Sequence, residues 1–402
     1  MSGIAFSGSE LSLSDEAVLV IGAGLGGLCL AQGLRKAGIP CAVFERDSSP
    51  EFRRQGYRLH IDSRGDGALR AVLPPHLHEL FRATSGRPRP AAAIYDDQLT
   101  SQMDVAEPDP VNLNINRFTL RQILLEGFDN VHFGKEFVGY EQQHGSVLAH
   151  FADGSTARGR ILVGADGVNS AVRRQYLPHA RIIDTGLRQL YGKIPLTPQT
   201  RELFDPEMHA VFCMFGAPDK TVLGIAPVDY PEPVAEACAR LAPTLRLRDR
   251  EPYMTNALFT RKEFLPHSDA ELRGLSGPAL GELVLDRIKG WHPRIRAMVH
   301  SWVPEATFPV VIRTSVPIGP WEATNVTLLG DAIHAMSPAA AAGANTAMKD
   351  GAELAAALGS GEADAIGAYE HEMRDYGFAA VRTSAQMGHQ YFGQDPLPTD
   401  AA

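Results

Sequence analysis

Residues 17–45 read AVLVIGAGLGGLCLAQGLRKAGIPCAVFE, and this stretch decides the fold. Ala17–Ile21 is a continuous apolar run that predicts a buried strand. A glycine-rich turn follows, and then Leu28–Ala37, whose apolar residues recur at helical spacing with Gly38 just past the end. Cys41–Glu45 is a second short apolar run and predicts another buried strand. Strand, turn, helix and strand make a βαβ unit, so the sequence predicts an α/β fold.

The turn in this unit fits the pattern G-x-G-x-x-G and predicts a site for the diphosphate of a dinucleotide. Gly22 permits the tight turn out of the strand, Gly24 lets a pyrophosphate approach the backbone, and Gly27 lets helix and strand pack closely. The N-terminus of the following helix offers free N–H groups and the positive end of its dipole to the phosphates. The candidate contacts in the turn are Gly22, Gly24, Leu25, Gly26 and Gly27.

An acid ends the second strand of the unit. Glu45 lies 18 residues after Gly27, where a carboxylate can accept hydrogen bonds from a ribose diol. A carboxylate there disfavours a 2′-phosphate, which argues against NADP as the resident cofactor and leaves NAD and FAD open. Glu45 and its neighbour Arg46 are therefore candidate cofactor contacts. The structural alternative is a glycine-rich turn followed by a surface glutamate.

The composition is that of a globular protein and excludes several classes of function. The chain has 402 residues, 44% of them hydrophobic, and a formal net charge of −9 from 38 Lys+Arg and 47 Asp+Glu. An acidic chain without a basic stripe argues against nucleic acid as a partner. The four cysteines stand singly, so we predict no metal site and no disulfide framework. The N-terminus lacks a signal-peptide pattern and no apolar stretch is long enough to span a bilayer, so we expect a cytoplasmic protein.

Two further motifs place an acid directly after a buried strand. The first is residues 164–173, GADGVNSAVR, and the second is residues 330–345, GDAIHAMSPAAAAGAN. Their acids, Asp166 and Asp331, each lie at the carboxyl end of a strand, where an aspartate can accept a hydrogen bond from a ribityl hydroxyl. The helix that follows Gly343 can aim backbone N–H groups at the N1–C2=O edge of a flavin, where the reduced ring carries negative charge.

The three motifs, in this order and spacing, resemble those of class A FAD-dependent monooxygenases, the p-hydroxybenzoate-hydroxylase-like aromatic hydroxylases. The resemblance extends from about residue 17 to about residue 390. It implies a Rossmann-like FAD-binding domain with the G-x-G-x-x-G turn, an antiparallel-sheet substrate domain and C-terminal helices. It also implies FAD as the cofactor, NADH or NADPH as a transient reductant, O₂ as co-substrate and a flavin C4a-hydroperoxide as the oxidant.

The resemblance also carries over to individual residues. Asn116-Arg117-x-x-Leu120-Arg121 is similar to the family's R-x-x-L helix, whose first arginine contacts FAD. The family places another arginine near the flavin ring at a point matching Arg53 or Arg54. Where the family often has P-x-x-G-x-G, this chain has Ala339–Ala342 before Gly343. The additional cofactor-binding candidates are Arg53, Arg54, Arg117, Val138, Asp166, Gly330, Asp331, Pro338, Gly343, Ala344 and Asn345.

Several candidates have a structural alternative that stays open. Asp166 could cap a turn, and Arg117 could form a surface salt bridge. His60 and His334 are read as structural hydrogen-bonding residues rather than proton relays. No residue stands out as a catalytic base, so the catalytic residues stay unassigned. For several apolar residues a place in the core is favoured over the alternative, the wall of an apolar substrate pocket. They are Tyr191, Phe212, Met214, Phe215, Phe259, Phe308 and Trp321.

The pattern along the chain suggests how the domains are divided. Residues 186–316 change character, with alternating apolar stretches and two of the three tryptophans, and predict an antiparallel sheet. Two long helices are expected near the end, and no thioredoxin-like domain is expected after Met387. We expect an FAD-binding domain at 1–75, 98–185 and 317–364, a substrate domain at 76–97 and 186–316, and a C-terminal helical segment at 365–402.

These features favour one function over two others. The favoured hypothesis is an FAD-dependent, NAD(P)H-consuming monooxygenase that hydroxylates or epoxidises an apolar aromatic or polyketide-like small molecule. The first alternative is an FAD-retaining oxidase, dehydrogenase or redox-neutral cyclase of the same fold. The second is a non-catalytic FAD- or NAD-sensing regulator. We expect a monomer or homodimer.

Overall fold

A parallel sheet forms the nucleotide-binding part of the molecule. The computed structural model describes residues 10–50, 52, 56–143, 145–248 and 250–398, so Arg53 and Arg54 lie outside the described residues. The sheet has the strand order β18-β12-β2-β3-β8, and every neighbouring pair is parallel. Its strands are β2 (Val18–Ile21), β3 (Cys41–Glu45), β8 (Val131–Phe133), β12 (Ile161–Gly164) and β18 (Val326–Leu328). The predicted α/β fold is confirmed.

Helices and a second sheet pack against the parallel sheet. The helices are α1 (Leu25–Lys36), α2 (Ser63–Val72) and α12 (Gly343–Ser360), with α1 packed along α12. The four-stranded sheet has the order β1-β11-β10-β9, from Glu10–Leu11, Thr156–Gly159, Ser146–Phe151 and Phe137–Gln143. The rings of Phe44 in β3 and Phe151 in β10 lie 4.7 Å apart and join the two sheets in one core.

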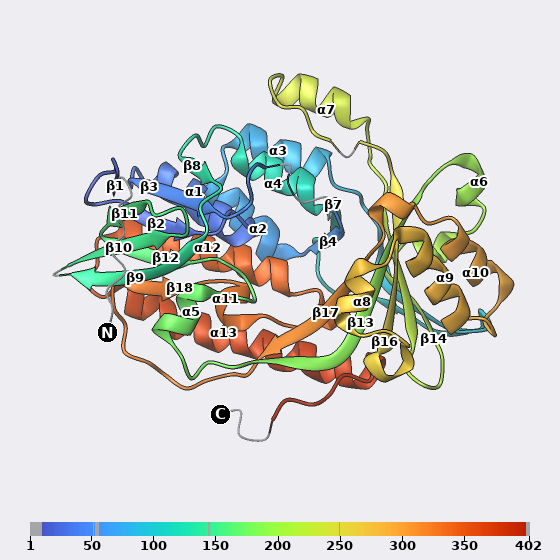
Figure 1. Ribbon diagram of the computed structural model, residues 1–402. Coiled ribbons are helices and arrows are strands. Elements are labelled where there is room, and N and C mark those ends of the chain that lie inside the picture. Colours follow the sequence, from blue (N-terminus) through green and yellow to red (C-terminus); the bar gives the residue numbers. More distant parts are fainter. Residues whose placement is uncertain (1–9, 51, 53–55, 144, 249, 399–402) are drawn as a thin grey trace.

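A seven-stranded sheet forms the other side of the molecule (Figure 1). Its order is β17-β13-β16-β15-β14-β5-β6, antiparallel except for the β14–β5 pair. The strands are β5 (Arg89–Asp96), β6 (Ser101–Ala106), β13 (Ile182–Pro195), β14 (Ala210–Gly216), β15 (Val222–Val228), β16 (Tyr253–Arg261) and β17 (Phe308–Ser315). Helices α8 (Asp269–Gly274), α9 (Gly277–Arg287) and α10 (Pro293–His300) contribute to the core on its outer face.

Strand β6 lies within 98–185, the range expected in the FAD-binding domain, yet it pairs with β5 in the seven-stranded sheet. The domain boundaries themselves stay a prediction.

The remaining helices are α3 (Pro75–Ala83), α4 (Arg117–Leu125), α5 (Ala171–Tyr176), α6 (Pro198–Arg201), α7 (Val234–Leu241), α11 (Asp331–His334) and α13 (Ala365–Met387). The short helical segments are η1 (Pro206–His209), η2 (Lys262–Phe264), η3 (Pro304–Ala306), η4 (Pro338–Ala340) and η5 (Gly388–Phe392).

A two-stranded ribbon lies between the two large parts. Strand β4 (Arg58–Ile61) pairs antiparallel with β7 (Leu113–Asn116). Side chains alternate across a strand, so each strand presents one residue set to each face. Leu59, Ile61, Leu113 and Ile115 belong to the nucleotide-binding core. We call the opposite face, made by Arg58, His60, Asn114 and Asn116, the polar ribbon face.

The inner face of the seven-stranded sheet carries an apolar cluster, here called the inner cluster. Its sheet members are Leu187, Tyr191, Val222, Ala257, Phe259 and Ile312. Phe392 of η5 joins them, with its ring 4.8 Å from Phe259. Half-buried residues pack against the cluster from other elements, among them Tyr57 before β4 and Ala339 in η4. The cluster therefore faces the elements that precede α12.

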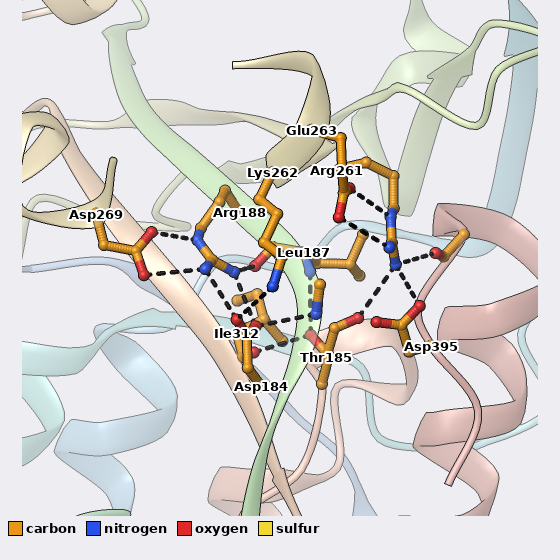
Figure 2. Close-up of polar contacts among 12 residues, drawn as sticks. Asp184, Thr185, Leu187, Arg188, Arg261, Lys262, Glu263, Asp269, Ile312 and Asp395 are labelled. Carbon is orange, nitrogen blue, oxygen red and sulfur yellow. Dashed lines mark hydrogen bonds and ion pairs between the residues drawn. The ribbon is translucent and has the colours of Figure 1, made fainter. Parts of the chain in front are cut away.

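Ion pairs attach the C-terminal segment to this sheet. Arg261 Nη1 donates to Asp395 Oδ1 at 2.7 Å, and the Asp395 N–H donates to the Thr185 carbonyl at 2.9 Å. Figure 2 shows this contact beside Arg188, which is held between Asp184 and Asp269. These contacts hold η5, and with it Phe392, against the inner cluster.

One predicted element differs from the observed one. The helix expected at Leu28 begins at Leu25, because the last two glycines of the motif form its first turn with Gly24 as N-cap. Strands β8 and β9 are separate, and Gly134 adopts a positive φ of 72° between them. Strands β10 and β11 pair antiparallel, and Gly154 in the turn between them has a positive φ of 85°.

Candidate functional site

The three motifs meet at one edge of the parallel sheet. Gly22 follows β2, Glu45 ends β3, Asp166 lies just beyond β12 and Gly330 just beyond β18. Because these four strands are parallel, their carboxyl ends lie at the same edge, which is where open α/β sheets bind ligands. Segments more than 300 residues apart in the sequence are thus brought together.

The glycine-rich turn has the shape that a diphosphate requires. Gly22 has a φ of 113°, and a Cβ there would lie 2.4 Å from the Ala165 carbonyl oxygen. A Cβ at Gly27 would lie 2.2 Å from the Gly22 carbonyl oxygen, so this glycine allows α1 to pack on β2. A Cβ at Gly24 would meet nothing within 4 Å. The fold thus needs Gly22 and Gly27 for packing, whereas the open side of Gly24 is free for a ligand to approach.

Glu45 is buried and fixed in place by backbone groups. Its Oε2 accepts a hydrogen bond from the Ala23 N–H at 2.9 Å, and its Oε1 accepts from the Asp47 N–H at 3.0 Å. Arg121 donates from Nε to the Ala23 carbonyl at 2.9 Å and places Nη2 4.0 Å from the carboxylate. The alternative of a surface glutamate is wrong, since Glu45 is 7% exposed. The carboxylate keeps lone pairs for a ribose diol.

Asp166 caps a helix, as its structural alternative proposed. Its Oδ2 accepts hydrogen bonds from the N–H groups of Ala171 and Val172 at 2.7 and 3.3 Å. Burial raises the pKa of this carboxyl. In the same motif Arg173 donates from Nη1 to the Ala332 carbonyl at 2.8 Å, which ties the second motif to the third. Whether Asp166 also contacts a cofactor stays a prediction.

The third motif is held by a buried carboxylate on α12. Asp350 Oδ2 accepts from the Gly330 N–H at 2.7 Å and pairs with His334 Nε2 at 2.6 Å, and Oδ1 accepts from the Tyr376 hydroxyl at 2.8 Å. Burial opposes a charge on His334, but the carboxylate beside it outweighs burial and raises its pKa. His334 is therefore a structural residue here, as expected. We call these contacts of Asp350 with Gly330 and His334 the clamp. Asp331 itself takes no part in the clamp and is exposed at the sheet edge.

Helix α12 presents an uncapped N-terminus beside Asp331. Among the described residues no side chain caps its first turn, which begins at Gly343 after Ala342. A Cβ at Gly343 would be 3.7 Å from Met336 Cγ and 4.0 Å from Asp331 Oδ1, both ordinary contacts. The positive end of this 18-residue helix can therefore face an anionic group.

The side chain of Asn345 is used within the protein. Its Nδ2 donates to the His60 carbonyl at 3.0 Å, and its Oδ1 accepts from the Asp62 N–H at 3.2 Å. These two hydrogen bonds attach the start of α12 to strand β4 of the two-stranded ribbon and to the residue after it. Ala341, which stands where the family has the first glycine of P-x-x-G-x-G, has a positive φ of 48°. An alanine in this left-handed conformation is strained.

Arg117 lies across the site from Asp331. It is the first residue of α4, its N–H donates to the Tyr57 carbonyl at 2.9 Å, and its guanidinium lies 5.6 Å from the Tyr57 ring centroid. The protein packed around Asp331 raises the pKa of that carboxyl, whereas the charges of His334 and Arg117 act to lower it. Arg117 and Asp331 are thus close enough to interact.

The other candidates lie less centrally or need not contact a ligand. Arg46 is exposed after β3, Pro338 is exposed in η4, and Val138 is 50% exposed on β9. Of the pocket candidates, Tyr191, Met214, Phe259 and Phe308 lie in or against the inner cluster. The core interpretation holds for Phe215, which lies in the outer core, and for Trp321, which packs on the nucleotide-binding core, because strand alternation and the path of the chain direct them there.

Sequence reasoning missed the polar ribbon face. Arg58 lies 5.1 Å from the Phe212 ring centroid, and the His60 ring meets Phe212 edge-on at 5.5 Å. Burial, with the charge of Arg58, lowers the pKa of His60 to about 4, so its imidazole is neutral at neutral pH. The signal was the polar–apolar alternation of residues 58–61 and 113–116, two runs too short to stand out alone.

The described part of the chain offers neither a metal-ligand cluster nor a helix that could cross a membrane. Among those residues, no group of three or more His, Cys, Asp or Glu side chains is arranged to hold a metal ion. None of the described helices has the length and apolarity needed to cross a membrane.

Comparisons with known proteins agree with the site. A family described as "NAD(P)-binding Rossmann-like domain" matches residues 20–83, and one described as "FAD binding domain" matches residues 314–384. A protein of Photorhabdus luminescens assigned as an FAD-containing monooxygenase has 31% identity and a TM-score of 0.82, over 95% of this chain and 99% of that one. The chain belongs to the FAD-dependent monooxygenases of the aromatic-hydroxylase type, class A.

Curated relatives extend this similarity. The dual O-methyltransferase/FAD-dependent monooxygenase elcB of Phaeosphaeria nodorum is 32% identical over 94% of this chain and 46% of its own length. The chain thus spans about half the length of that relative. The 6-hydroxynicotinate 3-monooxygenase of Pseudomonas fluorescens is 25% identical over 89% of this chain and 84% of its own length. FAD, the cofactor that the resemblance implied, is confirmed.

Proposed function

We propose that this protein is an NAD(P)H-consuming monooxygenase that adds one oxygen atom of O₂ to an apolar aromatic or polyketide-like small molecule. In a hydroxylation, NAD(P)H, a proton, O₂ and the substrate's C–H bond yield NAD(P)⁺, water and a C–OH group. In an epoxidation, the oxygen atom bridges a C=C bond instead. Bound FAD supplies the redox chemistry by accepting a hydride and activating O₂.

The carrying observation is that four strand ends and the uncapped start of α12 meet at one edge of the sheet. The open side of Gly24 and the N-terminus of α1 fit the diphosphate, and Glu45 fits the adenosine ribose. Asp331 fits the ribityl chain, and the backbone from Gly343 to Asn345 fits the electron-rich edge of the flavin ring. Arg117 is placed to balance negative charge near Asp331.

The inner cluster supports an apolar substrate. It packs against Ala339 in η4, four residues before α12 begins at Gly343, so a ring bound there lies close to the proposed flavin position. Apolar walls exclude water, which protects a reactive oxidant from side reactions. The name 6-hydroxynicotinate 3-monooxygenase, borne by one relative, describes oxygenation of an aromatic ring and supports an aromatic ring in the substrate here.

The test is an isotope experiment on the purified yellow protein. The heat-released flavin is identified as FAD or FMN, and anaerobic reduction is followed at the flavin absorbance with NADH and with NADPH. Turnover of electron-rich arenes such as 2-naphthol is then run under ¹⁸O₂, and the product is analysed by mass spectrometry. One ¹⁸O atom per product supports the proposal. Product formed under argon, or without label, contradicts it and favours a dehydrogenase or cyclase.

A further inference from the structure

The polar ribbon face is packed against the inner face of the seven-stranded sheet. Arg58 pairs with Asn116 and His60 with Asn114 across the two strands, so all four side chains share one face. Asn114 Nδ2 donates to the Pro227 carbonyl at 2.7 Å, and Asn116 Nδ2 donates to the Tyr253 hydroxyl at 3.2 Å. The two asparagines thus attach the ribbon to the sheet. Arg58 is therefore not the residue on which this attachment mainly depends.

Only neutral groups hold the guanidinium of Arg58. Its Nε and Nη2 donate to Asn114 Oδ1 at 2.9 and 2.6 Å, and Nη2 also donates to the Val211 carbonyl at 2.7 Å. No carboxylate among the described residues lies within 4.0 Å of its nitrogens, and Nη1 makes no hydrogen bond to those residues. Burial lowers the pKa of Arg58 to about 10, so the group stays charged at neutral pH.

A partly buried cation that has no carboxylate partner among the described residues calls for an anion. Removing a charge from water is unfavourable unless an opposite charge or several dipoles replace the hydration shell. Elsewhere in this sheet, Arg188 is buried between two carboxylates, Asp184 and Asp269. Arg58 has no such carboxylate pair among the described residues, so its charge is open to an anionic ligand.

The surroundings of Arg58 lead directly to the inner cluster. Its guanidinium lies over Phe212, and Tyr191 is near enough to affect the pKa of Arg58. The Tyr191 hydroxyl shares a hydrogen bond with Thr255 Oγ1 at 3.1 Å, and its ring stacks on Phe308 at 4.8 Å. Beside Arg58, the neutral His60 is buried with Nδ1 unpartnered among the described residues. Polar groups therefore line one end of an otherwise apolar surface.

We propose that Arg58 binds an acidic oxygen of the substrate, a carboxylate or a phenolate or enolate, while the inner cluster holds its ring. This inference rests on the proposed function, and it assigns the substrate class within it. An arginine contacts such an oxygen through a charge-assisted hydrogen bond, which is stronger than a neutral one. Asn345 hydrogen-bonds strand β4, which carries Arg58, to the start of α12. A substrate bound to Arg58 through its acidic oxygen is therefore held with its aromatic ring at a set position relative to that helix.

The test measures binding of matched probes to the holoprotein. 2-Naphthoate carries a carboxylate, and methyl 2-naphthoate has the same ring system without the charge. 2-Naphthol tests whether Arg58 binds a phenolate. The absorbance of 2-naphthol shifts to longer wavelength when the hydroxyl ionises, so the bound phenolate can be recognised. Dissociation constants are measured by isothermal titration calorimetry at pH 7. We expect 2-naphthoate to bind at least about tenfold more tightly than its methyl ester, or 2-naphthol to bind as the phenolate.

Three variants locate the effect at Arg58. Arg58→Met should reduce the preference to about twofold or less, and Arg58→Lys should retain part of it because the charge remains. Arg64→Met is the matched control, because Arg64 lies near the ribbon but pairs with Asp62 at its own exposed site. FAD content and the unfolding midpoint are measured for each variant. If Arg58→Met fails to fold, the comparison is made with Arg58→Lys.

Each result decides the proposal separately from the proposed function. Loss of the anion preference in Arg58→Met, with FAD retained, supports it even if no oxygenation is found. An unchanged preference in that variant overturns it, as does equal or undetectable binding of all probes to the wild type. Loss of FAD in Arg58→Met also overturns it, because Arg58 then serves the cofactor. Failure of the ¹⁸O experiment alone leaves these binding results intact.

Discussion

Nε2 of His334 and Oδ2 of Asp350 lie 2.6 Å apart, and both side chains are fully buried. The pair joins the turn after β18 to the middle of α12, so the position of Asp331 is set relative to the start of the same helix. Gly377 of α13 makes room for the imidazole, since a Cβ there would lie 2.7 Å from His334 Cδ2. The His334–Asp350 pair and Gly377 thus position Asp331 and the start of α12, although these three residues need not contact a ligand themselves.

Asp350→Asn should destabilise the protein and weaken FAD binding. Removing one partner of a buried ion pair costs about 3–5 kcal/mol, and an amide that keeps some hydrogen bonds should fall at the lower end. Because the folded pKa of His334 is raised, the pair's contribution is present below the unfolded pKa of about 6.5 and is lost as pH rises through the folded value. Urea unfolding from pH 5 to 9, with exposed Asp375→Asn as control, measures both effects. Equal stability of Asp350→Asn and wild type would refute the clamp.

Gly24→Ala and Gly27→Ala should fail in different ways. A Cβ at Gly24 meets no protein atom, so the FAD-free protein should unfold as the wild type does while FAD affinity falls. A Cβ at Gly27 meets the Gly22 carbonyl at 2.2 Å, so its unfolding free energy should fall by about 1–3 kcal/mol. Denaturant unfolding of the FAD-free proteins and flavin fluorescence titrations distinguish them. The turn is misassigned if Gly24→Ala binds FAD with wild-type affinity.

Ala341→Gly should stabilise the protein. The left-handed conformation costs an alanine about 1–2 kcal/mol, and glycine avoids this at an entropic cost of about 0.5–1 kcal/mol. The net gain of about 0.5–1 kcal/mol should appear as a higher unfolding midpoint. Ala340→Gly is the control, because its position is not left-handed and glycine should destabilise it. A lower midpoint for Ala341→Gly than for Ala340→Gly would contradict the strain at this loop.

Glu370 should make stability depend on pH. Burial raises its pKa to about 7, although Thr327 Oγ1 donates to Oε1 at 2.8 Å. A raised carboxyl pKa means that the stabilisation is present below the unfolded pKa of about 4.5 and is lost as pH rises through the folded value.

The corresponding variant is Glu370→Gln, which cannot ionise. Between pH 5 and pH 8 the wild type should lose about 2–3 kcal/mol of unfolding free energy relative to this variant. Exposed Glu372→Gln on the same helix should keep the wild-type slope. Parallel pH profiles for wild type and Glu370→Gln would show that Glu370 titrates normally.

The local elements around the nucleotide site could be predicted because their signals are local. Strand β3 was predicted with its observed bounds, and two long helices were expected near the end, where α12 and α13 lie. Buried parallel strands appear as continuous apolar runs, and the spacing of the glycines is dictated by one turn. The family followed from three such motifs in order.

The composition of the seven-stranded sheet and the polar ribbon face, which lie opposite the nucleotide site, became apparent only in the folded structure. Strands β5 and β6 join the seven-stranded sheet through a parallel pair with β14, a contact between segments that no local pattern connects. Arg58 and Asn114 are ordinary polar residues in the sequence, and only the pairing of β4 with β7 makes them one face.

The sequence by itself therefore determined the βαβ unit, the class of cofactor and the candidate residues at the strand ends. Each of these depends on residues within one turn or one strand. The hydrogen bond from Arg58 to the Val211 carbonyl, the strain at Ala341 and the ion pair between His334 and Asp350 depend on packing between distant segments. Such packing is set by how whole elements fit together, so only the folded chain reveals it.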